Sequence, residues 1–173
     1  MRGRASACWL LASLLVSVAA NADDLWMRDD ARWLVMLGAG AWDVAMPTDS
    51  KDTAPLYEIE LRMKPGFWYF HPHIGLQGTT DGMVYGYGGV HLDLPIGDHL
   101  RFVPSGSVGA YYQGDNGKDL VGTMEFRIGA GLAWRFSNDW RIGVDWYHMS
   151  NAGTAHQNPG AEMMLLEVGI PLP

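Results

Sequence analysis

The most restrictive feature of the sequence is a sustained alternation of apolar and polar side chains over residues 120–136. A period of two places alternate residues on opposite faces of a β-strand. Strands of globular domains usually span ~3–10 residues. A tilted strand needs ~9–11 residues to cross a bilayer, and it can continue beyond the lipid. The length of this alternation therefore predicts a membrane-crossing strand. Its large apolar residues are Leu120, Met124, Phe126, Ile128, Leu132, Trp134 and Phe136.

Seven further segments have strand-like composition and are separated by residues that favour turns, such as Lys64-Pro65-Gly66 and Thr80-Asp81-Gly82. Eight antiparallel strands can close into a barrel whose interior is filled by side chains. Closure leaves no unpaired strand edge in lipid. The sequence thus predicts an all-β fold, an eight-stranded antiparallel transmembrane β-barrel of the outer membrane. Besides 120–136, the expected strands are residues 31–44, 56–63, 67–79, 83–94, 100–112, 140–150 and 162–170.

Composition supports a barrel whose polar residues face inward. The chain contains 8 Trp, 7 Tyr and 22 Gly, and aromatic girdles are typical of transmembrane barrels. After residue 22 no apolar run approaches the ~18 residues of a helical span. The net charge of −7 gives no electrostatic basis for binding nucleic acid. We expect nine charged residues to point inward as an ion-paired plug: Glu58, Glu60, Arg62, Glu125, Arg127, Arg135, Arg141, Asp145 and Glu167.

Residues 1–22 have the pattern of a secretory signal peptide. Arg2 and Arg4 precede an apolar stretch, and Ala20-Asn21-Ala22 is a small-x-small cleavage sequence. The stretch is short for the ~20 residues of a retained transmembrane helix. Cys8 lies within this segment, so the mature chain would have no thiol chemistry. The expected organisation is a signal peptide at 1–22 and a single β-barrel domain at 23–173.

Strand parity places His148, Ser150 and Glu162 on one face. His148 and Ser150 continue the apolar row that contains Trp146, and Glu162 begins the next strand after a turn at residues 158–160. An antiparallel hairpin with His148 opposite Glu162 would bring a carboxylate, an imidazole and a hydroxyl together on the apolar outer face. This is the Ser-His-acid arrangement of an acyl hydrolase. We hypothesise that His148 is the general base for Ser150 and that Glu162 orients the imidazole; no metal or other cofactor is required.

The same residues resemble the signature of PagL-type lipid A 3-O-deacylases from Gram-negative outer membranes. The signature consists of His148-x-Ser150-Asn151-Ala152-Gly153 followed by Asn158-Pro159-Gly160-x-Glu162. The resemblance implies that His148, Ser150 and Glu162 form the catalytic triad, and that the Asn151 side chain and the Gly153 amide form the oxyanion hole. The chain departs from such barrels at its end, where Pro171-Leu172-Pro173 replaces the usual terminal aromatic residue.

The resemblance also implies the surroundings of the protein. Its substrate would be lipid A of lipopolysaccharide, its other partners would be outer-membrane lipids, and a homodimer is one candidate assembly. The protein would reach the Gram-negative outer membrane by export through its signal peptide. With both barrel ends of the chain in the periplasm, the seventh strand would end near the outer leaflet, where a lipid substrate could be attacked without entering a pocket.

Other interpretations of the sequence remain open. A non-catalytic small outer-membrane barrel with a structural or interaction role would show the same strand pattern. A soluble calycin-like barrel fits less well, because the outer parity is apolar. His71, His73 and His91 could form a metal cluster, but no carboxylate or cysteine pattern accompanies them, so packing in the lumen or at the interface is preferred. Gly86-x-Gly88-Gly89 lacks the strand, turn and helix of a dinucleotide site.

Overall fold

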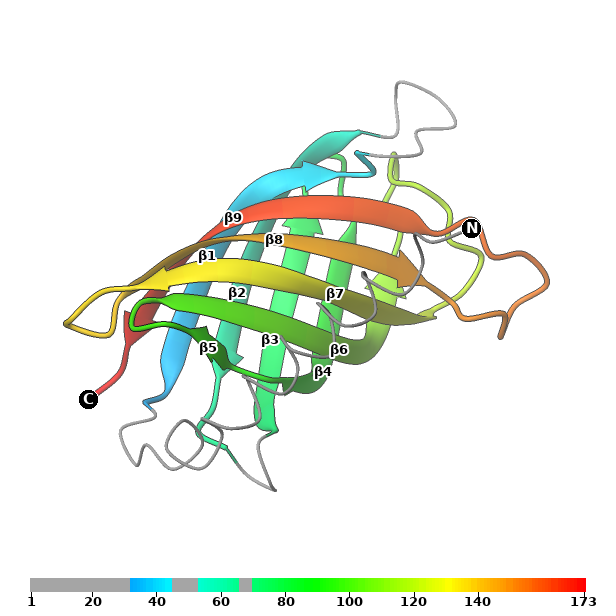
Figure 1. Ribbon diagram of the computed structural model, residues 1–173. Coiled ribbons are helices and arrows are strands. Elements are labelled where there is room, and N and C mark those ends of the chain that lie inside the picture. The colour runs from blue at the N-terminus through cyan, green and yellow to red at the C-terminus, as the bar shows by residue number, and fades with distance from the viewer. Residues whose placement is uncertain (1–31, 45–52, 66–69) are drawn as a thin grey trace, which may run out of the picture. The chain divides into compact units, whose positions relative to one another are not determined.

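The computed structural model describes residues 32–44, 53–65 and 70–173, and these residues form a β-barrel (Figure 1). The signal peptide predicted at 1–22 lies outside the described residues. Among the described residues, no helix has the length and apolar character needed to cross a membrane. The strands in this part of the chain are β1 Leu34–Trp42, β2 Ala54–Arg62, β3 His71–Thr79, β4 Val84–His91, β5 Leu94–Ile96, β6 Leu100–Tyr112, β7 Met124–Arg135, β8 Arg141–Ser150 and β9 Ala161–Pro171.

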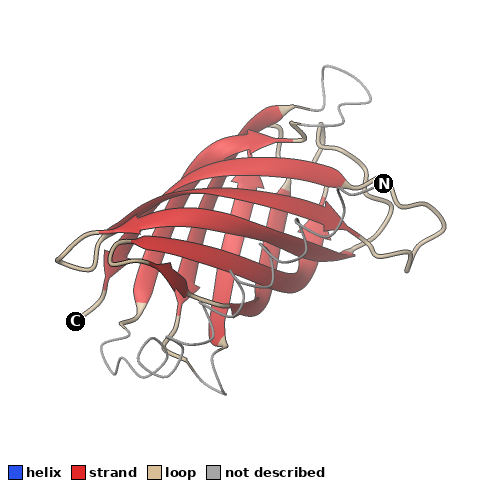
Figure 2. Ribbon diagram, in the orientation of Figure 1, coloured by secondary structure: helices blue, strands red, loops and turns tan. Residues whose placement is uncertain are grey.

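The sheet closes on itself through antiparallel pairs only (Figure 2). β1 pairs with both β2 and β9, and β4 pairs with β6 across the short β5. Because β5 pairs only with β6, the wall consists of eight strands. The predicted eight-stranded antiparallel barrel is confirmed. One end, here called the terminal end, carries the start of β1 and the end of β9. The opposite loop end carries the β3–β4, β6–β7 and β8–β9 connections.

The outer face of the wall is apolar. Apolar side chains and glycines occupy the outward positions of the strands, and the exposed large residues among them include Ile128, which is 66% exposed. Such a surface is stable in lipid and unfavourable in water. The apolar residues of the alternation that predicted membrane strands are therefore the ones that face outward. Those on six of the strands include Leu37, Ile59, Ile74, Val108, Ile128 and Leu166.

Arg127 is the centre of a polar plug inside the barrel. Its guanidinium lies 2.5 Å from Glu58 and 3.1 Å from Glu60. It also lies between the rings of Tyr87 and Tyr147, at 4.0 and 4.2 Å from their centroids. A buried arginine is tolerated only when carboxylates and hydrogen bonds replace its water. Arg127 therefore has both ionic and cation–π partners that offset its burial.

A second buried arginine extends the plug toward the terminal end. Arg62 binds Glu60 at 2.6 Å and Glu167 at 3.0 Å, and lies 3.5 Å from Asp145. The predicted inward ion pairs are confirmed for these residues. For Glu125 the prediction of an ion pair is wrong: its side chain is buried, but neither carboxylate oxygen has a hydrogen-bond partner among the described residues. Parity placed it inside correctly, but parity does not determine which charges meet.

Ion pairs also close the terminal end. Arg135 binds Asp139 at 2.5 Å, four residues on. Asp93, between β4 and β5, binds Arg141 at 2.6 Å and lies 3.9 Å from Arg101. Burial acts to raise the pKa of Asp93, but attraction and hydrogen bonding from Arg141, with a contribution from Arg101, lower that pKa below its ordinary value overall.

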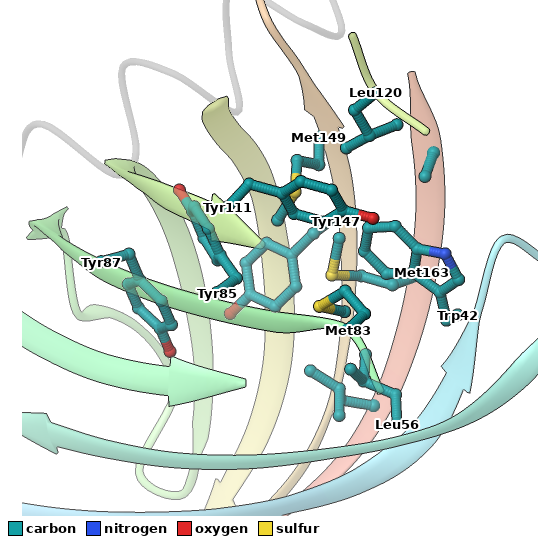
Figure 3. Close-up of a cluster of buried hydrophobic side chains, with 12 residues drawn as sticks. Trp42, Leu56, Met83, Tyr85, Tyr87, Tyr111, Leu120, Tyr147, Met149 and Met163 are labelled. Carbon is teal, nitrogen blue, oxygen red and sulfur yellow. The ribbon is translucent and has the colours of Figure 1, made fainter. Parts of the chain in front are cut away.

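An apolar cluster fills the lumen toward the loop end (Figure 3). Aromatic rings and methionines pack against one another there, and Trp42 stacks on Tyr111 with ring centroids 6.2 Å apart. Burial of these side chains from water contributes the apolar part of the barrel's stability. The cluster consists of Trp42, Leu56, Met83, Tyr85, Tyr87, Tyr111, Leu120, Tyr147, Met149, Ala161, Met163 and Leu165.

The seam between β1 and β9 depends on Gly40. Gly40 lies opposite Leu165, and a Cβ at this position would overlap the Met164 carbonyl oxygen and lie 2.8 Å from Leu165 Cα. Backbone atoms cannot move aside as a flexible side chain can. Gly40 thus lets the first and last strands approach closely enough to close the barrel.

The limits of most predicted strands differ from those in the structure by one to four residues, and the differences are clearest for the strands predicted at 120–136 and 83–94. β7 begins at Met124, not at Leu120, because Val121 has a left-handed φ of 67° that interrupts the extended chain. Leu120 consequently turns into the apolar cluster and does not face outward. The strand predicted at 83–94 ends at His91, and Leu94 lies in the separate short strand β5.

Candidate active site

The β8–β9 hairpin carries the predicted reactive residues. His148 is the cross-strand partner of Glu162, as the sequence predicted. Its Nδ1 lies 2.8 Å from Glu162 Oε1. Because an ionised carboxylate only accepts hydrogen bonds, this contact places the imidazole proton on Nδ1 and leaves Nε2 as an acceptor. The His148 side chain is 43% exposed and that of Glu162 is 11% exposed, so the pair lies on the outer face with the carboxylate partly shielded.

Ser150 lies on the same face of β8, two residues beyond His148 and opposite Phe126 of β7. It is half-buried. Within the described part of the chain, its hydroxyl makes no hydrogen bond to His148 Nε2. The hairpin thus joins the histidine to the acid directly and places the serine beside them. Nucleophile–base contacts are often loose in the absence of substrate.

Gly160 packs against the imidazole of His148. It immediately precedes β9 and has a φ of 62°, which favours glycine. A Cβ at this position would lie 3.0 Å from His148 Cε1 and 3.6 Å from His148 Nε2. The imidazole is therefore limited on one side by the Gly160 backbone and held at Nδ1 by Glu162. Lack of a side chain at residue 160 is part of what positions His148.

Asn151 organises the loop that follows Ser150. Its side-chain Nδ2 donates to the carbonyl oxygens of Leu120, at 3.0 Å, and Gln157, at 2.7 Å. Its Oδ1 accepts from the Gly153 N–H at 3.0 Å. Thr154 N donates to Asn151 O, and the positive φ angles of Ala152 and Gly153 match a type I′ turn. Both donors predicted for the oxyanion hole are thus engaged, the Gly153 N–H within its own loop and Asn151 Nδ2 with both this loop and the β6–β7 connection.

The surroundings of the site are apolar. Ile128 lies directly opposite His148 on β7, and Trp146 and Met164 form the next cross-strand pair along the hairpin. All three side chains are exposed on the outer face. Phe126 adjoins Ser150. A lipid chain lying along the barrel wall would meet apolar side chains on either side of the polar pair.

A second histidine–serine pair lies in the lumen and was not predicted from the sequence. His73 Nε2 forms a 2.8 Å hydrogen bond with Ser107 Oγ, and both residues are buried. The strand registers place His73 opposite Gly89, and Gly89 opposite Ser107. Because Gly89 has no side chain, the imidazole reaches across it. The pair has no access to lipid, which distinguishes it from His148 and Ser150.

The predicted alternative of a metal cluster concerns the same region. His73 Nδ1 lies 3.3 Å from His91 Nδ1, and His71 stacks on His91 with ring centroids 5.1 Å apart. His71 Nδ1 also lies 3.2 Å from the Met63 carbonyl oxygen. In the described ranges, no three His, Cys, Asp or Glu residues are arranged to hold a metal ion. The histidines pack as a stacked group in the lumen, as the preferred interpretation expected.

The closed wall, the apolar outer face and the polar pair on that face define a small membrane-type β-barrel with the elements of an acyl hydrolase on its outer surface. A family model described as lipid A 3-O-deacylase (PagL) matches residues 41–171. The chain belongs to this family, and the predicted family and fold class are confirmed. Membership places the chain among the lipid A deacylases of the Gram-negative outer membrane.

Solved structures show the same fold. The crystal structure of the outer membrane enzyme PagL is similar with a TM-score of 0.57 and 20% sequence identity, covering 80% of this chain and 99% of that chain. A de novo designed transmembrane β-barrel is similar with a TM-score of 0.56 and 14% identity, covering 84% of this chain and 98% of that chain. No individually curated protein matches the chain.

Proposed function

We propose that this chain is a serine esterase that removes an ester-linked acyl chain from lipid A at the outer face of the barrel. The observation that supports this proposal best is the 2.8 Å contact between His148 Nδ1 and Glu162 Oε1 on the lipid-facing surface, with Ser150 on the same face. Family membership supports lipid A as the substrate. The family description supports the 3-O ester as the bond that is cleaved.

The proposed reaction follows the chemistry of a Ser-His-acid triad. Ser150 Oγ attacks the ester carbonyl carbon while His148 Nε2 takes the hydroxyl proton, and Glu162 stabilises the resulting imidazolium. The tetrahedral intermediate collapses when the protonated imidazole gives its proton to the departing sugar alkoxide. Water, deprotonated by His148, then attacks the acyl-enzyme. This step releases the fatty acid, returns the proton to Ser150 and restores the enzyme.

The proposed oxyanion donors are the Asn151 side chain and the Gly153 amide. Removal of one such donor typically costs ~10²–10³-fold in rate. Gly153 N now donates to Asn151 Oδ1, and Asn151 Nδ2 donates to Gln157 O and Leu120 O. Stabilisation of the oxyanion by these groups therefore requires that at least one of these bonds be shared with it or exchanged for it when substrate binds.

The cellular setting is also proposed. Residues 1–22 would direct export and be removed, which N-terminal sequencing of the mature protein would test. The outer face of the barrel would lie among outer-membrane lipids, with the hairpin that carries His148 and Ser150 ending toward the outer leaflet. A homodimer stays a prediction that size analysis in detergent would test.

The decisive experiment compares two serine variants of the full protein. Ser150→Ala is expected to lower kcat for a soluble p-nitrophenyl ester by ~10⁴-fold or more, and to abolish loss of one acyl chain from lipid A measured by mass spectrometry. Ser107→Ala is the matched control, because it removes a serine that is bonded to a histidine in the lumen. Full activity is expected for this variant.

The comparison separates three outcomes. If Ser150→Ala retains deacylation, Ser150 is not the nucleophile. If Ser107→Ala abolishes it while Ser150→Ala does not, the lumenal pair carries the chemistry. If the unaltered protein cleaves neither substrate, the barrel is a non-catalytic member of its family, which is the alternative expected from the sequence.

A further inference from the structure

A cleft lies at the loop end of the barrel beside the β6–β7 connection. Its volume is about 370 Å³, within the ~300–1,000 Å³ typical of small-ligand sites. The proposed reaction makes no use of it. The residues that line it are Tyr111, Tyr112, Gln113, Gly114, Asp119, Val121, Gly122 and Thr123.

The lining suits a ligand that is rich in hydroxyl groups. Tyr112 is 65% exposed and offers an aromatic ring. Asp119 is exposed and offers a carboxylate, which accepts hydrogen bonds only. None of the lining residues is Lys or Arg, and the neighbouring Lys118 is buried against Asp43 at 2.6 Å. Among the described residues, the lining therefore has acceptors and an aromatic face but no cation for a phosphate group.

The shape of the cleft is fixed by bonds within its own loop. Val121 has a φ of 67°, which is strained for a β-branched residue. Asp119 Oδ1 accepts from Val121 N at 2.7 Å, and the other Asp119 carboxylate oxygen has no hydrogen-bond partner in the described chain. Tyr111 donates to Lys118 O at 2.6 Å. A strained backbone held by several bonds is typical of a site that is formed before its ligand binds.

The cleft adjoins the proposed nucleophile. Asn151, which directly follows Ser150, donates to the carbonyl oxygen of Leu120 at 3.0 Å. A Cβ at the lining residue Gly122 would lie 3.4 Å from Asn151 Cβ, so these two residues are in contact. Phe126, opposite Ser150, lies on the same strand that starts just beyond the cleft. The residue that follows Ser150 is thus packed against the wall of the cleft.

From this arrangement we infer that the cleft binds the saccharide headgroup of the glycolipid whose acyl ester lies at Ser150. The inference rests on the proposed function and adds how the substrate is selected. Tyr112 stacks on the apolar face of a sugar ring, and Asp119 accepts a hydrogen bond from a sugar hydroxyl. The acyl chains lie along the apolar wall below. The site consequently distinguishes an acylated saccharide from a glycerophospholipid by its headgroup.

The test uses the full barrel in detergent and two substrates: lipid A and a p-nitrophenyl ester that has no sugar. Tyr112→Leu is expected to raise the KM for lipid A by ~3–10-fold, the effect of losing one aromatic contact, with the KM for the sugar-free ester unchanged. Asp119→Asn keeps a side-chain oxygen that can accept from Val121 N. It should also raise the KM for lipid A and leave the KM for the sugar-free ester unchanged. Tyr57→Leu and Asp115→Asn are the matched controls, because Tyr57 is 56% exposed on β2 and Asp115 is exposed in the same loop outside the lining.

A binding measurement separates this inference from the proposed chemistry. The deacylated disaccharide of lipid A, titrated into Ser150→Ala and followed by tryptophan fluorescence or NMR, should bind saturably and bind more weakly when Tyr112→Leu is added. Binding with no hydrolysis by the unaltered protein would support the cleft and refute the proposed function. Three results, each with hydrolysis retained, would overturn the inference. The first is that the disaccharide does not bind. The second is an unchanged KM for lipid A in Tyr112→Leu and Asp119→Asn, and the third is an equal rise in KM for both substrates.

Discussion

Replacing Gly160 with Ala should weaken catalysis by displacing the imidazole of His148. The new Cβ would lie 3.0 Å from His148 Cε1, closer than such atoms normally approach. The ring must therefore move by a few tenths of an ångström, away from Gly160. Glu162 holds Nδ1 at 2.8 Å, so displacement would change the direction in which Nε2 points. Glu162 and His148 would remain paired, but the base would be misaligned with Ser150.

The size of the effect follows from two separate contributions. Alanine at a left-handed φ costs ~1–2 kcal/mol of stability, whatever surrounds it. Misplacement of a reacting group by ~1 Å can lower the rate by ~10²-fold. A displacement of ~0.3–0.5 Å then corresponds, on a logarithmic scale, to a ~4–10-fold loss. We expect this loss in kcat, with little change in KM, because substrate contacts are not altered.

Gly97→Ala is the matched control for backbone strain. Gly97 has a φ of 66°, close to the 62° of Gly160, but a Cβ at Gly97 would have no atom within 4 Å. Both variants should lose similar stability in urea unfolding, and only Gly160→Ala should lose kcat for a soluble p-nitrophenyl ester. Equal kcat values for the two variants, at equal folded fractions, would refute the positioning role of Gly160.

Three further predictions concern the barrel itself. Glu125→Leu removes a buried carboxylate that has no hydrogen-bond partner in the described part of the chain, so the midpoint of urea unfolding should stay equal or rise; a large fall would reveal an essential contact. Gly40→Ala should prevent folding, scored as loss of the faster-migrating band of unboiled protein on a denaturing gel, whereas Gly106→Ala, with no atom near its added Cβ, should fold. Asp93 has a folded-state pKa below its unfolded value, because Arg141 outweighs its burial. The contribution of ionised Asp93 to stability is therefore complete above the unfolded pKa and is lost as pH falls through the lower folded pKa. Asp93→Asn should therefore destabilise the barrel at pH 7, and the destabilisation should shrink steadily as the pH falls below the unfolded pKa.

Strand parity predicted much of the fold because the side chain of each residue in the barrel wall can face only the lipid or the lumen. The outward position of Ile128 and the inward position of Arg127 both follow from a period of two. The contact between His148 and Glu162 was also predictable, since two consecutive antiparallel strands have few registers that keep both apolar faces outward.

Features that depend on distant parts of the chain were not predictable in the same way. The left-handed φ that breaks the alternation falls on Val121 and not on the adjacent Gly122, so the sequence does not mark the residue at which the strand is interrupted. The bond between His73 and Ser107 requires three strands to be aligned around Gly89. Partners within the lumen likewise depend on the relative stagger of all the strands, which explains why the isolation of Glu125 could not be foreseen.

The exposure of His148 on the barrel wall has a kinetic consequence. A lipid substrate in the leaflet reaches the imidazole by lateral diffusion in two dimensions. It need not pass through water, and the barrel need not open. Turnover at low substrate density should therefore follow the viscosity of the surrounding membrane. The physical state of the bilayer, set by its chain length and temperature, becomes a determinant of rate alongside the groups on the protein.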